Sequence, residues 1–165
     1  MIPQRASDSA ATTAAVYADL QRSLAGLLAG EADLIANAAN FTALVYHSLP
    51  DLNWAGFYFL RGEELVLGPF QGRPACVRIA MGRGVCGTAA LRRTSVLVPD
   101  VHQFPDHIVC DLASRSELVV PLIDVNRLMG VFDLDSPRPN RFDAVDQAGI
   151  EAAVRLLVEA CRNPK

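Results

Sequence analysis

Residues 117–135, ELVVPLIDVNRLMGVFDLD, contain the pattern that decides the fold. Two apolar runs, at residues 117–124 and 128–134, are rich in Val, Ile and Leu and are separated by residues 125–127. Two such runs around a tight turn are typical of antiparallel neighbouring strands. We therefore expect a β-hairpin here.

Working outward, the rest of the chain alternates between strand and helix patterns. Leu20, Leu24 and Leu28 recur at helical spacing. The patterns predict strands at residues 53–60, 64–68, 75–80 and 95–98, helices at 12–28, 31–47 and 142–161, and a short helix that follows Gly82 and ends near Arg93. Strand hairpins flanked by helices indicate an α+β fold, an antiparallel sheet with helices packed on one face. We expect one domain over residues 1–165, with residues 1–10 as a flexible N-terminal extension.

Composition excludes several classes of function. The chain has 165 residues, 51% of them hydrophobic and 20% charged, which is typical of a folded domain. A net charge of −3 without a basic run argues against a nucleic-acid or anionic-membrane partner. No stretch approaches the roughly 18 apolar residues that span a bilayer, and the N-terminus lacks the order of a secretory signal. We therefore expect a cytoplasmic protein.

The sequence contains four cysteines, at positions 76, 86, 110 and 161. In a reducing compartment structural disulfides are disfavoured, whereas transient catalytic disulfides are allowed. The spacings do not form the paired Cys-x-x-Cys of a zinc site. A metal site that uses His102 or His107 is a minor alternative, and we expect no metal.

Each cysteine has a functional and a structural interpretation. Cys110 lies in a long predicted loop, residues 99–114, where a thiol is accessible enough to react or is incidental. Cys76 lies at the start of a predicted strand, where its sulfur could reach another loop or fill the core. Cys86 lies just inside the short helix, where a helix N-terminus can lower a thiol's pKa, although a buried small residue explains it equally well. We interpret Cys161 as structural.

Alternation along the second strand of the hairpin places Asp133 and Asp135 on one face. Two carboxylates on an otherwise apolar strand are costly to bury without a partner. A bound ammonium group would compensate, and so would a raised pKa that keeps one acid protonated. Glu117 could lie alongside them across the hairpin. Alternatively, Asp135 only begins a turn, and Glu117 is a solvated charge.

The same alternation places Trp54 and Tyr58 on one face of an earlier strand. Together the two rings could form the wall of a pocket for an apolar group such as a methyl. Packing in the core is the usual alternative for such aromatic residues.

Six segments of the chain resemble the GAF-domain enzymes called free methionine-(R)-sulfoxide reductases. They are LNWAGFY at 52–58, LGPFQG at 67–72, GRGVCG at 82–87, PDVH at 99–102, SELVVPL at 116–122 and GVFDLDSP at 130–137. The glycine-led helix and the hairpin alone would indicate only a GAF fold. The cysteines at 76, 86 and 110 together with the acidic residues make the resemblance more specific.

The resemblance implies a GAF-like antiparallel sheet of about six strands and a homodimer. It also implies thiol-dependent reduction of free L-methionine-(R)-sulfoxide to L-methionine through a cysteine sulfenic acid and an intramolecular disulfide, with thioredoxin as the reductant and no cofactor. In this interpretation Cys110 is the nucleophile, Cys76 the main resolving thiol and Cys86 a secondary partner. The residues that would line the substrate pocket are Trp54, Tyr58, Glu117, Asp133 and Asp135.

Protonation of the sulfoxide oxygen requires a neutral acid beside the nucleophile, and Glu117 or Asp135 could supply it. The residues do not decide between these two carboxyl groups, nor which cysteine pair forms the resting disulfide. Two other functions are open: a GAF domain that binds a small molecule without chemistry, and a redox sensor whose Cys76–Cys110 disulfide changes dimer contacts.

Overall fold

The computed structural model describes residues 5–106, 108 and 111–162, except for the side chains of residues 5–12. Its helices are α1 (Arg5–Leu27), α2 (Leu34–Ser48), α3 (Gly84–Arg92) and α4 (Ala144–Arg162). Its strands are β1 (Trp54–Arg61), β2 (Glu64–Gly72), β3 (Arg78–Ala80), β4 (Val96–Val98), β5 (Ser116–Asp124) and β6 (Arg127–Ser136). A 3-10 turn, η1 (Val101–Gln103), interrupts the loop after β4.

The six strands form one antiparallel sheet in the order β3-β2-β1-β6-β5-β4. The predicted hairpin is confirmed: β5 pairs with β6, and Asp124 lies opposite Arg127 across a loop of two residues. Val125, the first loop residue, has a φ of 56°, which suits the left-handed turns that close short hairpins. The predicted α+β class with an antiparallel sheet of about six strands is therefore confirmed.

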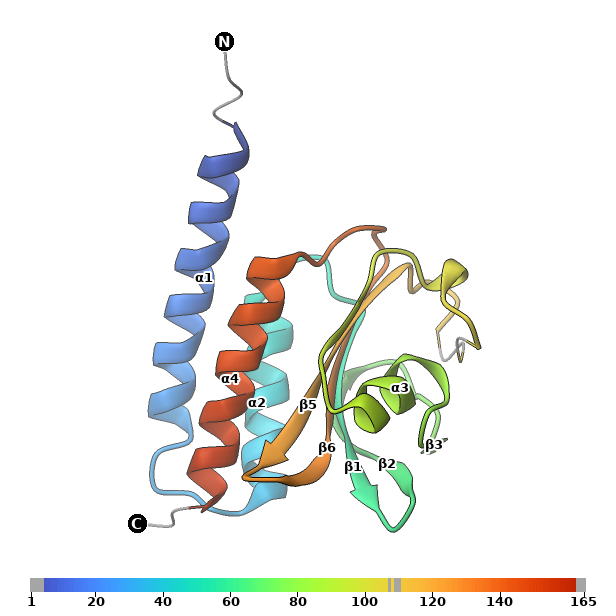
Figure 1. Ribbon diagram of the computed structural model, residues 1–165. Helices are drawn as coiled ribbons and strands as arrows, with labels where there is room; N and C mark the ends of the chain where they lie inside the picture. Colours follow the sequence, from blue (N-terminus) through green and yellow to red (C-terminus); the bar gives the residue numbers. More distant parts are fainter. Residues whose placement is uncertain (1–4, 107, 109–110, 163–165) are drawn as a thin grey trace.

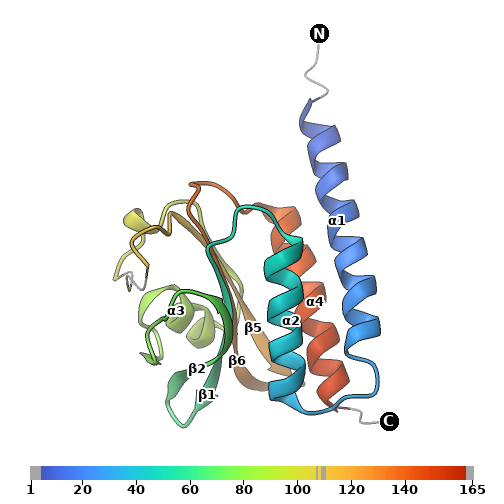
Figure 2. The same cartoon turned by 180° about the vertical axis from the view of Figure 1, so that it is seen from behind.

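Helices lie on both faces of the sheet. Three of them, α1, α2 and α4, form a layer on one face, whereas the short α3 lies on the other (Figures 1 and 2). The larger core lies under the three-helix layer, where Phe41 of α2 meets the rings of Phe57 and Phe132 edge to face at 5.4 and 5.0 Å. The expectation of helices on one face therefore holds for three helices, and α3 covers the opposite face.

Several boundaries differ from the predicted ones. Helix α1 begins at Arg5, within the stretch predicted as an extension, and β2 continues to Gly72. The third strand begins only at Arg78, and in the segment before it two side chains of β1 hydrogen-bond the carbonyl groups of Arg73 and Cys76. Among the helices in the described ranges, none is both long and apolar enough to cross a membrane.

Helices α1 and α4 are joined by a buried polar contact. The Tyr17 hydroxyl donates a hydrogen bond of 2.8 Å to Asp146, and Arg141 contacts both oxygens of the same carboxylate at 3.2 Å. Burial, and then the charge of Asp146, raise the pKa of Tyr17, which keeps its hydroxyl a donor. Gly149 lets the ring lie against α4, since a Cβ there would lie 2.3 Å from ring carbons of Tyr17.

Replacing Gly149 by Ala should lower the free energy of unfolding by about 1–3 kcal/mol, because the added methyl forces α1 away from α4. The matched control is Gly26→Ala in α1, where a Cβ would meet nothing within 4 Å. This change should raise stability by about 0.4–1 kcal/mol, because alanine restricts the unfolded chain. Urea unfolding of both variants measures the difference, and equal midpoints would contradict this packing.

Candidate active site

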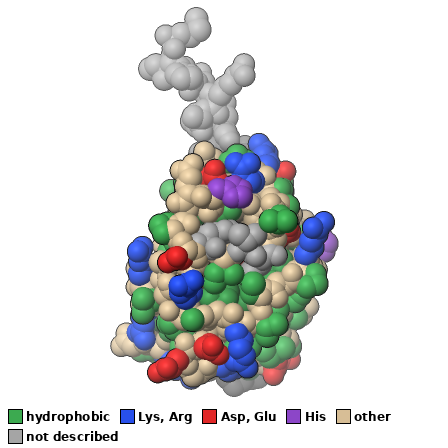
Figure 3. Space-filling view, turned by 90° about the vertical axis from the view of Figure 1, so that its right-hand side faces the viewer, with side chains coloured by type: hydrophobic (Ala, Val, Ile, Leu, Met, Phe, Trp, Pro, Cys, Tyr) green, Lys and Arg blue, Asp and Glu red, His purple; other side chains and the backbone are tan. Residues whose placement is uncertain are grey.

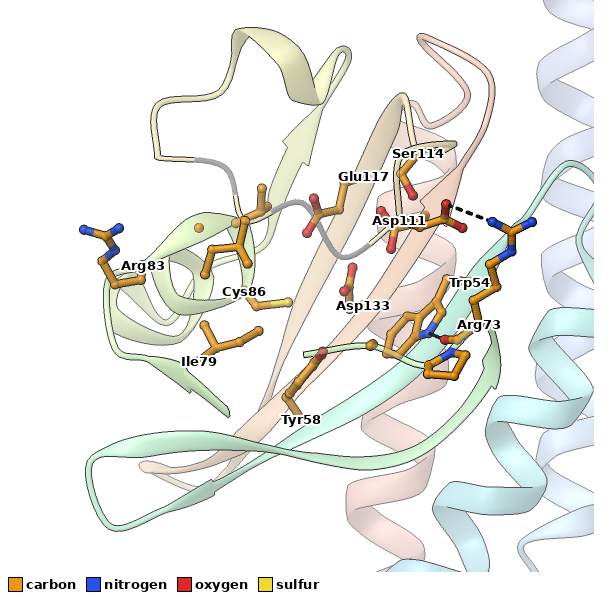
Figure 4. A pocket seen from close by; sticks show the side chains of 16 residues that line it. Trp54, Tyr58, Arg73, Ile79, Arg83, Cys86, Asp111, Ser114, Glu117 and Asp133 are labelled. Carbon is orange, nitrogen blue, oxygen red and sulfur yellow. Dashed lines mark hydrogen bonds and ion pairs between the residues drawn. The ribbon is translucent and has the colours of Figure 1, made fainter. Parts of the chain in front are cut away.

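A pocket opens on the sheet face opposite the three-helix layer, between the strands, α3 and the loop after β4 (Figure 4). Strand register decides which side chains line it. Trp54 of β1 lies opposite Asp135 of β6, which in turn lies opposite Glu117 of β5. Asp133 lies two residues from Asp135 and shares its face. The predicted alternation thus brings the three acids and the aromatic residues together.

The pocket also contains residues that the sequence did not single out. They are Arg73, Pro74, Ala75, Ile79, Arg83, Gly84, Val85, Ile108, Asp111 and Ser114. Arg83, Gly84 and Val85 lie in the GRGVCG segment that carried the family resemblance. Proximity in sequence to the cysteines could have indicated others: Asp111 follows Cys110, and residues 73–75 precede Cys76. From the side of α3 (Figure 3), apolar side chains gather around the middle of this face and charged ones lie mostly toward its edges.

Trp54 and Tyr58 are buried and stack on one another, with centroids 5.9 Å apart. The Trp54 indole N–H donates to the carbonyl of Arg73 at 3.0 Å, and the Tyr58 hydroxyl donates to the carbonyl of Cys76 at 3.0 Å. The rings therefore do more than fill the core. They form one wall of the pocket and hold the backbone that bears Cys76, which is itself partly exposed.

The stacked arrangement requires a glycine at position 56. A Cβ on Gly56 would lie 2.5 Å from the Trp54 ring and 2.5 Å from the Cβ of Phe70. Trp54 and Phe70 stack across this position with centroids 5.6 Å apart. The absence of a side chain thus lets the indole lie flat over the strand.

The floor of the pocket is acidic. Glu117 and Asp133 are only 5% and 6% exposed, and Asp135 is partly buried beside Ser114. Burial raises the pKa of all three carboxyl groups well above their ordinary values. Repulsion adds to each shift: from Asp135 on Glu117, from Glu117 on Asp133 and from Asp133 on Asp135. The cluster can therefore hold a proton at a pH where isolated carboxyl groups have lost theirs.

One oxygen of this cluster lacks a partner. The Oδ1 atom of Asp133 is buried and accepts no hydrogen bond from the residues that the structure describes. Its side chain points into the space between Cys86 and Glu117 (Figure 4). An unsatisfied buried acceptor is costly, so this position suits a donor that arrives with a ligand.

Cys86 is buried in the first turn of α3. The sequence left open that the helix N-terminus lowers its pKa; the structure shows the opposite. Burial raises the pKa of this thiol well above its ordinary value, and the charges of Asp133 and Glu117 raise it further. Burial, with the two carboxyl groups from other elements adding to it, therefore decides the direction of the shift at this position.

The candidate nucleophile Cys110 lies outside the described residues, as does His107. Ile108 and Asp111, which flank residues 109–110, both line the pocket. Asn53 fixes the segment that follows by donating hydrogen bonds to Asp111 at 3.1 Å and to Ser114 at 3.0 Å. The pKa of Asp111 is below its usual value, chiefly because its carboxylate accepts a hydrogen bond from the amide N–H of Ala113. The hydrogen bond from the Asn53 side chain lowers it further.

The two remaining candidates lie away from the pocket. His102 is exposed in η1, and within the described ranges it belongs to no group of side chains that could hold a metal ion. Cys161, on α4, accepts a contact of 3.6 Å from the Asn37 amide in the helical layer. Its surroundings agree with a structural cysteine.

Cys86 offers a direct test of this electrostatic arrangement. In a protein whose other three cysteines are serines, ¹³C NMR of labelled Cys86 should show ionisation above the pKa of a free cysteine, because burial and the acids disfavour the thiolate. Asp133→Asn should lower that pKa, and Asp124→Asn, far from the pocket, should leave it unchanged. A Cys86 pKa below that of a free cysteine would contradict this arrangement.

Comparison with known proteins identifies relatives over most of the chain. The GAF domain family matches residues 4–160. A protein of Escherichia coli (strain K12) named free methionine-R-sulfoxide reductase is 52% identical over 141 residues, 86% of each chain. A Burkholderia vietnamiensis structure described as a putative GAF sensor protein is 58% identical, with a TM-score of 0.88 over 92% of this chain and 99% of that one. The substrate complex of free methionine-R-sulfoxide reductase from Neisseria meningitidis is 40% identical, with a TM-score of 0.88 over 92% and 91%.

Proposed function

We propose a mechanism from the premise that the chain belongs to the GAF domain family and, within it, to the free methionine-R-sulfoxide reductases. The chain reduces free methionine-(R)-sulfoxide to methionine. One observation carries the mechanism: an aromatic wall faces a floor of buried carboxyl groups with raised pKa values, between the segments that bear Cys76 and Cys110.

The substrate has three groups that the pocket could recognise. Its methyl and methylene groups lie against the rings of Trp54 and Tyr58. Its ammonium group donates to Asp133, whose buried Oδ1 atom has no partner among the described residues. A methionine sulfoxide within a peptide has no such ammonium group, so this contact selects the free amino acid. The carboxylate rests on the first N–H groups of α3, where Arg83 provides no side-chain cap.

Reduction begins with attack of the Cys110 thiolate on the sulfoxide sulfur. The sulfoxide oxygen must be protonated or strongly hydrogen-bonded for this step, since only then is the sulfoxide sulfur electrophilic. Glu117 or Asp135 donates that proton, and their raised pKa values support the role because each carboxyl group keeps its proton to a higher pH than an ordinary carboxyl group does. The S–O bond of the substrate then breaks as the oxygen passes to the Cys110 sulfur, so methionine is released and Cys110 becomes a sulfenic acid. The thiol has lost two electrons and the sulfoxide has gained them.

A second thiol completes the cycle. The thiol of Cys76 attacks the sulfenic acid, water leaves, and a Cys76–Cys110 disulfide forms. The partial exposure of Cys76 supports it as the resolving thiol, whereas the burial and raised pKa of Cys86 disfavour a thiolate there. Reduced thioredoxin then exchanges its two thiols for the disulfide. We place this cycle in the cytoplasm and assign the enzyme a homodimeric state.

Serine variants separate the roles of the cysteines. Cys110→Ser should abolish methionine release even in a single turnover, because no nucleophile remains. Cys76→Ser should release about one methionine per enzyme and then stall with thioredoxin, because the sulfenic acid is not resolved efficiently. Cys161→Ser is the matched control and should turn over normally.

Quantification of methionine by chromatography, after mixing with the free (R)-sulfoxide, provides the measurement. Normal turnover by Cys110→Ser would refute the assignment of the nucleophile. Repeated turnover with thioredoxin by Cys76→Ser would instead transfer the resolving role to another thiol.

The acid can be identified from the pH dependence of the single-turnover rate. A raised pKa means that the carboxyl group stays protonated to a higher pH than usual, so the rate should fall as the pH rises through that pKa. Removing the acid should lower the rate by about 10²–10⁴-fold and abolish this decline. Glu117→Gln and Asp135→Asn test the two candidates, and persistence of the decline in both variants would exclude them.

A further inference from the structure

We propose that Cys86, Glu117 and Asp133 form a binding site for Zn²⁺, and that the ion and the amino-acid substrate exclude one another. One ligand atom from each residue lies within 4.8 Å of the other two. Thiolate sulfur and carboxylate oxygen are both ligands of Zn²⁺. A tetrahedral ion with ordinary bond lengths would hold these atoms about 3.4–3.7 Å apart, so small side-chain rotations close the site.

The three ligands come from regular elements, which fixes their directions. Cys86 belongs to α3, Glu117 to β5 and Asp133 to β6, and all three side chains are buried. Sites formed from helices and strands hold their ligands more precisely than sites formed from loops. Three protein ligands would leave a fourth position for water or an anion, as in zinc sites that are not closed.

An independent observation indicates a cation at this place. The Oδ1 atom of Asp133 is buried, points into the cluster and has no hydrogen-bond partner among the described residues (Figure 4). Nor does any Arg or His of the described part form an ion pair with Asp133. A buried carboxylate oxygen without a partner is costly, and a positive ligand removes that cost.

The sulfur decides which cation is favoured. The proposed reaction assigns resolution to Cys76 and gives Cys86 no chemical step that requires a thiolate. A thiolate among carboxylates favours Zn²⁺ and softer ions over Mg²⁺ and Ca²⁺, which prefer sites made entirely of oxygen. The ion must displace the proton from the thiol, so binding should release protons and strengthen as the pH rises.

Competition follows because Asp133 would serve both ligands. This part of the inference rests on the proposed function, in which the same carboxylate binds the substrate's ammonium group. Zn²⁺ would therefore be a reversible inhibitor of reduction and not a cofactor of it.

Cd²⁺ is a suitable probe of binding, because its thiolate complexes absorb in the ultraviolet. In a protein with Cys76, Cys110 and Cys161 changed to serine, Cys86 is the sole sulfur ligand from cysteine. Titration with Cd²⁺ should produce the thiolate-to-metal band with one ion bound, and Zn²⁺ should displace it. Asp133→Asn should weaken binding by about tenfold or more, while Asp124→Asn, the matched control, should not.

Circular dichroism checks that each variant is folded. If the Asp133→Asn variant is unfolded, the Glu117→Gln variant takes its place in the titration. Absence of the band, or equal affinity in the folded Asp133→Asn and Asp124→Asn variants, would overturn the site.

Inhibition is tested on the full reduced protein in single turnover without added thiol. Zn²⁺ should raise the substrate concentration that gives half the limiting rate and leave that limiting rate unchanged, and a chelator should reverse the effect. Bound Zn²⁺ without such a rise would overturn the competition. If Cd²⁺ binds but no methionine is released even without metal, the proposed function fails and the metal site stands.

Discussion

The register of three neighbouring strands, β1, β6 and β5, is the constraint on which the site depends. It places Trp54, Asp135 and Glu117 in one row, and Asp133 on the same face two residues away along β6. A slip of one residue would turn these groups into the core under the three-helix layer and would turn Phe132 and Leu134 toward the pocket. Gly130 helps to hold this register, because a Cβ there would lie 2.1 Å from the carbonyl oxygen of Tyr58.

The two faces of the sheet divide stability and chemistry between them. Under α1, α2 and α4 lies the larger apolar core, with Phe41, Phe57 and Phe132 at its centre. The opposite face buries Glu117 and Asp133 at a cost in free energy that the raised pKa values reflect. The large core offsets this cost, and the same unfavourable burial makes the pocket receptive to a proton or a cation.

Side chains in and just before β1 also position two segments that border the pocket. Trp54 and Tyr58 hold the backbone at Arg73 and Cys76, and Asn53 holds the stretch that begins at Asp111. Each contact joins a side chain of β1, or Asn53 just before it, to a segment 18 to 61 residues further along the chain. The beginning of β1 and the residue before it thus anchor two segments that border the pocket.

The sequence by itself determined the hairpin and the common face of Asp133 and Asp135, because both follow from a local period of two residues. It also indicated the long loop that contains Cys110. Only the tertiary structure decided that α3 covers the pocket face, that Asn53 and Ser114 support the site, and that the pKa of Cys86 is raised and not lowered. These properties depend on groups from different elements that meet in space: the burial of Cys86 and the nearby carboxyl groups of Asp133 and Glu117 are set by tertiary packing, which leaves no local pattern in the chain.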